Sequence, residues 1–284
     1  MKVLTLGDGF IANHLNYDKI TEKVQLHWSE TKAMLSHHRP DVLINCLGRT
    51  GRPNVDWCEK NKLETAEGNV SIPVMLAELC SKLYIHMIHI GSGCIYFGES
   101  PHKEYVDDGN LSLGGFTIDH GWKEDDFANP QSYYSQTKYA CDLAIGSYSN
   151  VSILRIRMPI SNKNEPRNLI NKLRGYSEII DIPNSVTFIH DLKRCVNWVA
   201  KEKVSGIYHV VNPQPLTAAR IMREYQKHLP NHQFTIITEE QLNQLTIAKR
   251  SNCILNTDKL NNAGFHMTPA EEALEQCMNN YMDK

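Results

Sequence analysis

The feature that most constrains the fold is the alternation of short apolar runs with helix-like segments along the first half of the chain. We predict strands at Lys2–Leu6, Val24–His27, Val42–Cys46, Tyr84–Ile90 and Val151–Ile156. Helical patterns separate or follow them, at Ile11–Tyr17, Lys60–Lys82 and Tyr134–Tyr148. Short apolar strands joined by helical crossovers are typical of a parallel sheet with helices on both faces. Because such crossovers are right-handed, we predict an α/β, Rossmann-like, doubly wound parallel sheet.

The second half of the chain is less regular and predicts a smaller C-terminal subdomain. The polar segment Ser161–Pro166 breaks the alternation. Beyond it we predict a strand at Gly206–Val211 and helices at Arg167–Tyr176, His190–Lys201, Thr217–Leu229 and Pro269–Met282. We therefore expect a sheet domain over 1–160 and a subdomain over 161–284, partly interleaved with the sheet near 181–212. We expect Glu99–Phe127 to be a long insertion loop, and such loops are often functional or mobile.

Composition argues against several classes of partner. The chain has 30 Lys and Arg against 32 Asp and Glu, so its charge gives no reason to expect nucleic acid or an anionic membrane surface. No apolar run approaches the roughly 20 residues of a membrane span, and the N-terminus lacks the apolar stretch of a signal peptide. The eight cysteines are scattered without a C-x-x-C pair, which predicts reduced thiols, no bound metal and a cytoplasmic location.

A glycine-rich loop follows the first predicted strand. Residues 7–12 read GDGFIA, which has the form G-x-G-x-x-A. The first glycine permits a tight turn, the second lets a pyrophosphate approach the backbone, and the small third residue lets the helix pack on the strand. We therefore predict a dinucleotide site here, with phosphates at the start of the next helix. An ordinary strand-to-helix turn is the alternative interpretation.

The choice between NADH and NADPH depends on the end of the second strand. A site that prefers NADH places a carboxylate there to bind the ribose 2′-hydroxyl. The predicted strand Val24–His27 has none at its tip, and Glu30 comes just beyond it. This favours NADP(H). Lys32 and Arg49 are candidates for the 2′-phosphate, although each could equally be an ordinary surface charge.

Tyr134 and Lys138 form a Y-x-x-x-K sequence at the start of a predicted helix. This spacing puts both side chains on one helical face, where an ammonium can favour the phenolate and assist proton transfer to or from a carbinol oxygen. Such a sequence also arises by chance in amphipathic helices. Ser92 follows the strand before it and adds a hydroxyl at the carboxyl edge of the sheet. The three residues together resemble the catalytic set of short-chain dehydrogenases.

Several longer phrases narrow the resemblance. They are GRTGRPNVDWCEKNKLET (48–65), GCIYF (93–97), YSQTK (134–138), RIRMPIS (155–161), PRNLINKL (166–173), DIPNSVT (181–187), GIYHVVNP (206–213) and KRSN (249–252). The chain resembles the bifunctional UDP-4-keto-6-deoxyglucose 3,5-epimerase/4-reductases, which belong to the extended short-chain dehydrogenase/reductase superfamily and are similar to dTDP-4-dehydrorhamnose reductases. Two features depart from that family. Its glycine loop has the form G-x-x-G-x-x-G, one residue longer than here, and the 99–127 loop looks longer than usual.

The resemblance implies an activity and a set of site residues. The family converts UDP-4-keto-6-deoxy-D-glucose to UDP-L-rhamnose with NADP(H). Residues 1–160 would then bind NADP(H) and 161–284 the UDP-sugar. Cys94 and Lys172 match the epimerisation residues, beside Ser92, Tyr134 and Lys138 for reduction. The implied cofactor-binding residues are Gly7, Gly9, Phe10, Ile11, Leu47, Gly48, Asn69, Tyr134, Lys138 and Met158, and the candidate substrate-binding residues are Arg52, Asn168 and Arg250.

The epimerisation chemistry can be argued independently of the resemblance. A 4-ketone acidifies the protons at C3 and C5, and inversion of each carbon needs a base on one face and an acid on the other. A thiol and an amine on opposite walls of a pocket could supply them. The sequence does not decide which of Cys94 and Lys172 acts at which carbon, nor whether the nucleotide is UDP or dTDP.

Two other functions stay open at this point. A reductase without epimerase activity would need neither Cys94 nor Lys172. A non-catalytic, NADP(H)-binding regulatory subunit would not need Ser92, Tyr134 and Lys138. A homodimer paired through the helix 134–148 is also possible, as in related enzymes.

Overall fold

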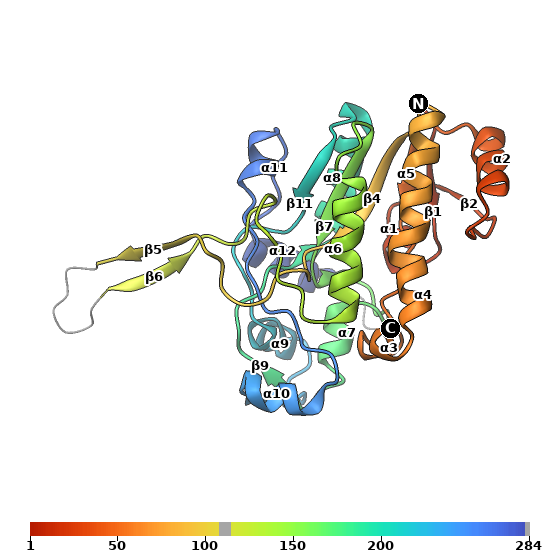
Figure 1. The fold of residues 1–284 in the computed structure, drawn as a ribbon. Coiled ribbons are helices and arrows are strands. Elements are labelled where there is room, and N and C mark those ends of the chain that lie inside the picture. The colour runs from red at the N-terminus through yellow and green to blue at the C-terminus, as the bar shows by residue number, and fades with distance from the viewer. Residues whose placement is uncertain (108–114, 282–284) are drawn as a thin grey trace.

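The computed structural model describes residues 1–107 and 115–281, and its centre is a parallel sheet of six strands (Figure 1). The strand order is β11-β7-β4-β3-β1-β2, and every neighbouring pair is parallel. The strands are β1 (Val3–Leu6), β2 (Asp18–Ile20), β3 (Val42–Asn45), β4 (His86–Ser92), β7 (Val151–Ile156) and β11 (Gly206–His209). The predicted Rossmann-like α/β class is confirmed.

Helices cover both faces of this sheet, and each face has its own apolar core. One core joins the strands to α2 (Trp28–His38), α5 (Ile72–Lys82) and α6 (Tyr133–Ile145). The other joins them to α1 (Phe10–His14), α8 (Ile189–Glu202) and α11 (Asp258–Asn262). All residues of β3 and β7 are buried, which is why their sequences are almost continuously apolar.

A third apolar cluster lies beyond the carboxyl edge of the sheet. It is built from residues between Ile160 and Phe188 and between Leu216 and Met278. Its helices are α7 (Leu169–Leu173), α9 (Ala218–Gln226) and α12 (Ala270–Asn279). Two small pairs of parallel strands belong to the same region. They are β8 (Pro159–Ile160) with β10 (Thr187–Phe188), and β9 (Glu178–Ile180) with β12 (Thr235–Ile237). Helix α10 (Glu239–Leu245) follows β12.

The second strand is not where the sequence predicted it. Val24–His27 is a connection, and β2 forms earlier, at Asp18–Ile20. Helix α1 ends at His14 rather than Tyr17, because Asn16 adopts a left-handed conformation (φ 57°) that turns the chain back to the sheet. β2 then pairs with β1 and buries Ile20.

The single helix predicted over Lys60–Lys82 is instead four segments. They are α3 (Asp56–Lys60), α4 (Lys62–Ala66), the π-helical turn η1 (Glu67–Ser71) and α5. Asn61 leaves the helical region between α3 and α4. Pro73 has no N–H to bond the carbonyl of residue 69, which accounts for the wide turn before α5. π-turns of this kind often mark functional sites, and this one contains Asn69.

Glu99–Phe127 is not an irregular loop throughout. Within it, β5 (Lys103–Val106) and β6 (Phe116–Asp119) pair as an antiparallel hairpin that projects from the body (Figure 1). The predicted loop residues 108–114 lie outside the described residues. Trp122 anchors the base of the hairpin, since its ring stacks on Tyr96 with centroids 4.9 Å apart and its Nε1–H donates to the Gly98 carbonyl at 3.1 Å.

Candidate active site

The candidate site lies at the carboxyl edge of the sheet, where the strand order reverses between β1 and β3. A crevice forms at such a switch point, and ligands of doubly wound sheets bind there. Gly7 follows β1 in a conformation that L side chains rarely adopt (φ 111°). A Cβ at this position would lie 3.3 Å from the carbonyl of Cys46, at the end of β3. Glycine is therefore favoured at position 7 for two reasons, the backbone conformation and the closeness of the Cys46 carbonyl.

The second loop glycine leaves room for a ligand. Gly9 is the N-cap of α1, no side chain caps the helix, and a Cβ at Gly9 would meet nothing within 4 Å. The residues present therefore fit the pyrophosphate of a nicotinamide dinucleotide against open backbone. Phe10 and Ile11 follow and are partly buried against the core under α8.

Asn69 fixes the neighbouring loop after β3. Its Oδ1 accepts from Arg49 N at 2.7 Å, and its Nδ2 donates to the Arg49 carbonyl at 3.0 Å and to Thr137 Oγ1 at 3.1 Å. A Cβ on Gly48 would lie 3.3 Å from the same Oδ1. The π-turn thus ties Leu47–Arg49 to the helix that carries Tyr134, and all the Asn69 bonds seen here are to protein groups.

The structure brings Ser92 and Tyr134 together. Ser92 is the last residue of β4 and is buried, while Tyr134 is half-buried in the first turn of α6. Burial raises the pKa of the Tyr134 hydroxyl above its usual range, and a hydrogen bond with Ser92 acts in the opposite direction. The Ser92 oxygen also accepts from Cys94 N at 3.2 Å.

Lys138 lies one turn after Tyr134 on α6, is buried, and is held by β4. Its Nζ donates to the Ile90 carbonyl at 3.2 Å and lies 3.2 Å from His89 Nε2. The sequence analysis expected a lowered pKa for Tyr134, but burial is the largest influence on it and raises it.

The start of α6 is held by three contacts. Ser132 caps the helix by accepting from Ser135 N at 3.2 Å, and Ser135 Oγ donates to the Cys94 carbonyl at 2.6 Å. Glu59 accepts from Tyr133 N at 2.7 Å. Glu59 belongs to the RPNVDWCE phrase, so one role of that phrase is to fix the helix that presents Tyr134.

Asp56, in the same phrase, fixes the C-terminal segment over the site. Its carboxylate accepts from both Nη atoms of Arg250, at 2.8 and 3.2 Å, and from Ala248 N at 2.9 Å. Partial burial opposes ionisation of Asp56, but the hydrogen bonds and charge of Arg250 outweigh it, and its pKa is lowered.

Cys94 and Lys172 belong to one electrostatic cluster. Cys94 is half-buried just beyond β4, and Lys172 is half-buried on α7. Burial lowers the pKa of Lys172, the charges of Arg167 and Arg250 lower it further, and Cys94 opposes them. The charge of Lys172 therefore responds to Cys94 as well as to Arg167 and Arg250.

Arg167 is a candidate site residue that the sequence analysis missed. Its Nη2 donates to the Gly51 carbonyl at 2.7 Å, and burial followed by the charge of Arg52 lowers its pKa. Arg52 thus acts on Arg167, and Arg167 and Arg250 act on Lys172, so the four cations lie near one another. Its position in the sequence could have identified Arg167, since it stands in the PRNLINKL phrase next to Asn168, which was predicted to bind substrate.

Asn168 and Met158 shape the backbone around the site. Asn168 is fully buried, caps α7, accepts from Ser161 N at 3.1 Å and donates to the carbonyls of Ser161 and Lys163, both at 2.8 Å. The bonds of this side chain are therefore within the protein. Met158 adopts φ 41° directly after β7, where the chain turns into β8.

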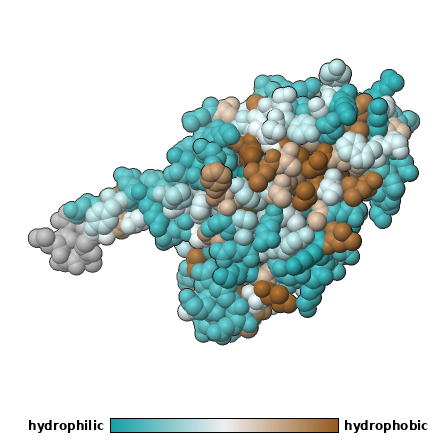
Figure 2. Space-filling model, in the orientation of Figure 1, coloured by the Kyte–Doolittle hydropathy of each residue, from teal (hydrophilic) through white to brown (hydrophobic). Residues whose placement is uncertain are grey.

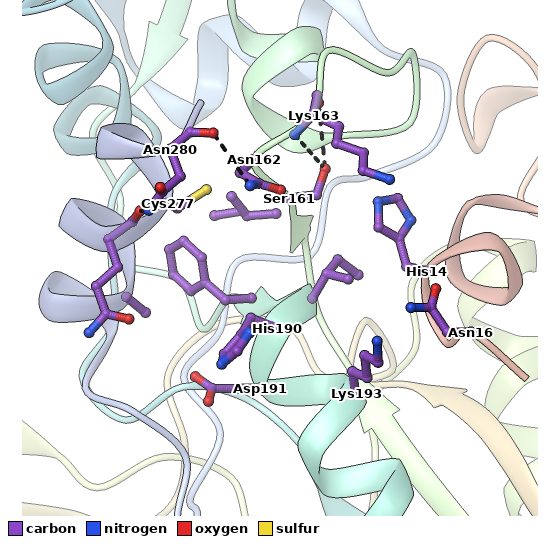
Figure 3. Close-up of a pocket in the computed structure, with 15 residues that line it drawn as sticks. His14, Asn16, Ser161, Asn162, Lys163, His190, Asp191, Lys193, Cys277 and Asn280 are labelled. Atoms are coloured by element: carbon purple, nitrogen blue, oxygen red, sulfur yellow. Dashed lines mark hydrogen bonds between the residues drawn. The ribbon is translucent and has the colours of Figure 1, made fainter. Parts of the chain in front are cut away.

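A cavity of about 390 Å³ lies elsewhere, between α1, α8 and α12 (Figure 3). None of the predicted site residues lines it. The carboxylate in its lining, Asp191, already accepts from Asn212 Nδ2 at 2.6 Å and from Thr268 Oγ1 at 3.0 Å. We therefore do not assign the reaction to it.

Within residues 1–107 and 115–281, no group of three or more His, Cys, Asp or Glu side chains could hold a metal ion. Among the same residues, no helix has the length and apolar character needed to cross a membrane.

The parallel sheet, with a serine, tyrosine and lysine at its carboxyl edge, is typical of nicotinamide-dependent short-chain dehydrogenases/reductases. Comparison with known proteins gives the family. The family described as the RmlD substrate binding domain matches residues 19–282, and this chain belongs to it. A bifunctional dTDP-4-dehydrorhamnose 3,5-epimerase/dTDP-4-dehydrorhamnose reductase of Arabidopsis thaliana is 36% identical over 225 residues, covering 78% of this chain and 71% of that protein.

Longer relatives and solved structures agree with this. A trifunctional UDP-glucose 4,6-dehydratase/UDP-4-keto-6-deoxy-D-glucose 3,5-epimerase/UDP-4-keto-L-rhamnose-reductase of Arabidopsis thaliana is 35% identical, and the match spans 32% of its length. The crystal structure of the L780 UDP-rhamnose synthase from Acanthamoeba polyphaga mimivirus has a TM-score of 0.87 and 28% identity, and the match covers 99% of both chains. A dTDP-4-dehydrorhamnose reductase of Bacillus anthracis in complex with NADP shares the fold, with a TM-score of 0.78, 18% identity and 98% coverage of both chains. The predicted family and enzyme class are confirmed.

Proposed function

We propose that this chain epimerises a nucleotide-linked 4-keto-6-deoxyglucose at C3 and C5 and then reduces its 4-keto group with NADPH, so that UDP-4-keto-6-deoxy-D-glucose becomes UDP-L-rhamnose. The observation that carries the proposal is the position of Cys94 beside the reducing residues, since its N–H donates to Ser92 Oγ at 3.2 Å and its carbonyl accepts from Ser135 Oγ, next to Tyr134, at 2.6 Å. The names of the bifunctional and trifunctional relatives and of the L780 synthase support it.

The reduction needs a proton at the C4 oxygen. When bound, NADPH supplies the hydride. Tyr134 is the proton donor in this proposal because its hydroxyl adjoins that of Ser92 at the carboxyl edge of the sheet, and the Ser92 hydroxyl can hold the same oxygen. The enolate formed during epimerisation carries its charge on that oxygen, so Ser92 and Tyr134 also stabilise it.

The epimerisation needs a base and an acid on opposite faces of the sugar. Cys94 enters from the end of β4 and Lys172 from α7. The lowered pKa of Lys172 suits an amine that exchanges a proton near neutral pH. The guanidinium groups of Arg52 and Arg167 suit the diphosphate of the substrate, because they match phosphate oxygens, whereas both Nη atoms of Arg250 are held by Asp56. In this proposal Asn168 shapes the α7 end of the pocket rather than contacting substrate.

Preference for NADPH needs a new argument, because the earlier one relied on the end of a predicted strand, Val24–His27, that the structure does not contain. With β2 ending at Ile20, Glu22 lies two residues beyond the strand, exposed and 2.8 Å from His38 Nε2. We propose NADPH because the Bacillus anthracis reductase of the same fold is in complex with NADP. Arg49, at the end of β3, and Lys32, exposed on α2, remain the candidate cations for the 2′-phosphate.

The decisive experiment separates epimerisation from reduction. The protein is incubated with UDP-4-keto-6-deoxyglucose in D₂O with NADP⁺ in place of NADPH, and deuterium at C3 and C5 is followed by NMR. The proposal expects exchange at both carbons. Cys94→Ser keeps the size of the side chain but replaces the thiol by a hydroxyl, which is a far poorer acid and base, so exchange should be lost at one or both carbons.

Cys277→Ser is the matched control, because Cys277 is another half-buried cysteine but lies on α12. Its exchange should equal that of the wild type. Reduction of a pre-epimerised 4-keto-rhamnose nucleotide should survive in Cys94→Ser. Undiminished exchange in that variant would favour a reductase without epimerase activity. Absence of both reactions in the wild type would favour the regulatory subunit.

We also propose that the 161–284 region is the substrate-binding subdomain and that two copies pair through α6. Hydrophobic residues gather on the face over α5 and α6 (Figure 2). Leu143 is 66% exposed there, with Ala140 and Ala144 exposed beside it on the helix. Light scattering should give a dimer for the wild type and a monomer for Leu143→Asp. A monomeric wild type would refute the pairing.

A further inference from the structure

His89 lies beside Lys138 in the interior and has no role in the reaction described above. It is fully buried on β4, where it pairs with Asn45 of β3 in the sheet register. Its Nε2 is 3.2 Å from Lys138 Nζ. Burial, with the charge of Lys138, holds the pKa of His89 well below its usual range, so the ring is neutral. On the other side, its partner on β7 is the apolar Ile153.

A chain of hydrogen bonds decides which ring nitrogen carries the proton. The backbone N–H of Leu47 can only donate, and it donates to Asn45 Oδ1 at 3.0 Å. The amide nitrogen of Asn45 therefore faces His89, 3.0 Å from Nδ1. Nδ1 must accept that bond, so the proton of the neutral ring is on Nε2.

The Nε2–H group points at Lys138. A protonated lysine has three donors and no acceptor, so it cannot accept this hydrogen, whereas a neutral amine can. The Ile90 carbonyl, 3.2 Å from Nζ, accepts from lysine in either form. Among the described residues, the other group in hydrogen-bond contact with Nε2 is the Cys141 thiol at 3.7 Å, whose sulfur is a weak acceptor.

We infer that His89 is a positioning residue for Lys138, whose Nε2–H holds the lysine amine in place once that amine has given up a proton to restore Tyr134. The inference rests on the proposed reduction. As C4–O⁻ takes the Tyr134 proton, the tyrosine O–H bond breaks and the product O–H bond forms. An Nζ–H bond of Lys138, one helical turn away, then breaks as the tyrosine O–H re-forms, and solvent protons later restore the lysine.

The test is the pH dependence of kcat for reduction of a pre-epimerised 4-keto-rhamnose nucleotide. His89→Phe keeps a planar ring but removes the N–H that favours the neutral amine. In this variant, the fall of kcat at alkaline pH (the alkaline limb) should move to higher pH by about half to one unit, which corresponds to the free energy of one hydrogen bond. The KM for NADPH should change little. His89→Gln presents an acceptor toward Asn45 and a donor toward Lys138, so its limb should stay near that of the wild type.

Cys141→Ala is the control, because it removes the other neighbour of Nε2 and should leave the limb unmoved. An unshifted limb in His89→Phe, or an equal shift in His89→Gln, would overturn the inference. A second measurement needs no turnover. ¹⁵N NMR of the histidine-labelled wild type, assigned by the signal lost in His89→Gln, should show a neutral ring with its proton on Nε2. A proton on Nδ1, or a charged ring at neutral pH, would also overturn it. A wild type that reduces no 4-keto nucleotide would instead refute the proposed function.

Discussion

The buried ion pair between Asp142 and Arg155 should make the fold around the active site sensitive to the loss of either charge alone. Asp142 lies on α6, one turn beyond Lys138, and Arg155 on β7, with 1% and 2% of their side chains exposed. Arg155 Nε donates to Asp142 Oδ2 at 2.8 Å, and Nη1 donates to Tyr96 Oη at 2.8 Å. The pair therefore locks the catalytic helix to the sheet and to the segment after Cys94.

Asp142→Asn should lower the free energy of unfolding by about 3 kcal/mol. Breaking a buried pair costs about 3–5 kcal/mol because the remaining charge is left without compensation. We expect the lower end because Tyr96 and the Glu124 carbonyl still accept from Arg155. The double variant Asp142→Leu/Arg155→Met leaves no unpaired charge and should recover most of the loss.

Urea unfolding with linear extrapolation measures these changes. The exposed pair Arg220–Glu271 provides the control, since its side chains are 36% and 49% exposed and Glu271→Gln should cost less than about 1 kcal/mol. The reasoning would be refuted by a loss below about 1 kcal/mol in Asp142→Asn, or by a double variant as unstable as the sum of its single changes.

Three further outcomes are expected. Tyr134→Phe should slow reduction by about 10²- to 10⁴-fold with little change in NADPH affinity, and steady-state kinetics showing a near wild-type rate would contradict its role as proton donor. Burial lowers the pKa of His86 to about 4 and that of His209 well below its usual range, so the unfolded chain takes up protons first. Stability should therefore fall by about 1.4 kcal/mol for each ring between pH 7.5 and 5.5, and urea midpoints that stay constant over this range would count against it. Glu22→Gln removes a negative charge beyond β2 and should strengthen NADPH binding relative to NADH in fluorescence titrations, whereas an unchanged ratio would place the 2′-phosphate elsewhere.

The sequence alone determined the sheet architecture and the family. Continuous apolar stretches such as Val42–Asn45 and Val151–Ile156 identify strands buried on both faces, because polar side chains have no water there. The glycine loop and the phrases around Cys94, Tyr134 and Lys172 are local, so their spacing can be recognised without knowing how the chain folds. The resemblance rested on these phrases, and the family match agrees with it.

Only the tertiary structure decided the position of β2 and the partners of the polar side chains. Val24–His27 has a strand-like pattern, but the left-handed turn at Asn16 brings Asp18–Ile20 to the free edge of β1 first. The partners of Lys138 are likewise set by packing, because His89 and Ile90 come from a strand about 50 positions earlier in the chain. A buried polar side chain pairs with the hydrogen-bonding groups nearest to it, and which groups are nearest depends on how α6 lies on the sheet rather than on the sequence around Tyr134 and Lys138.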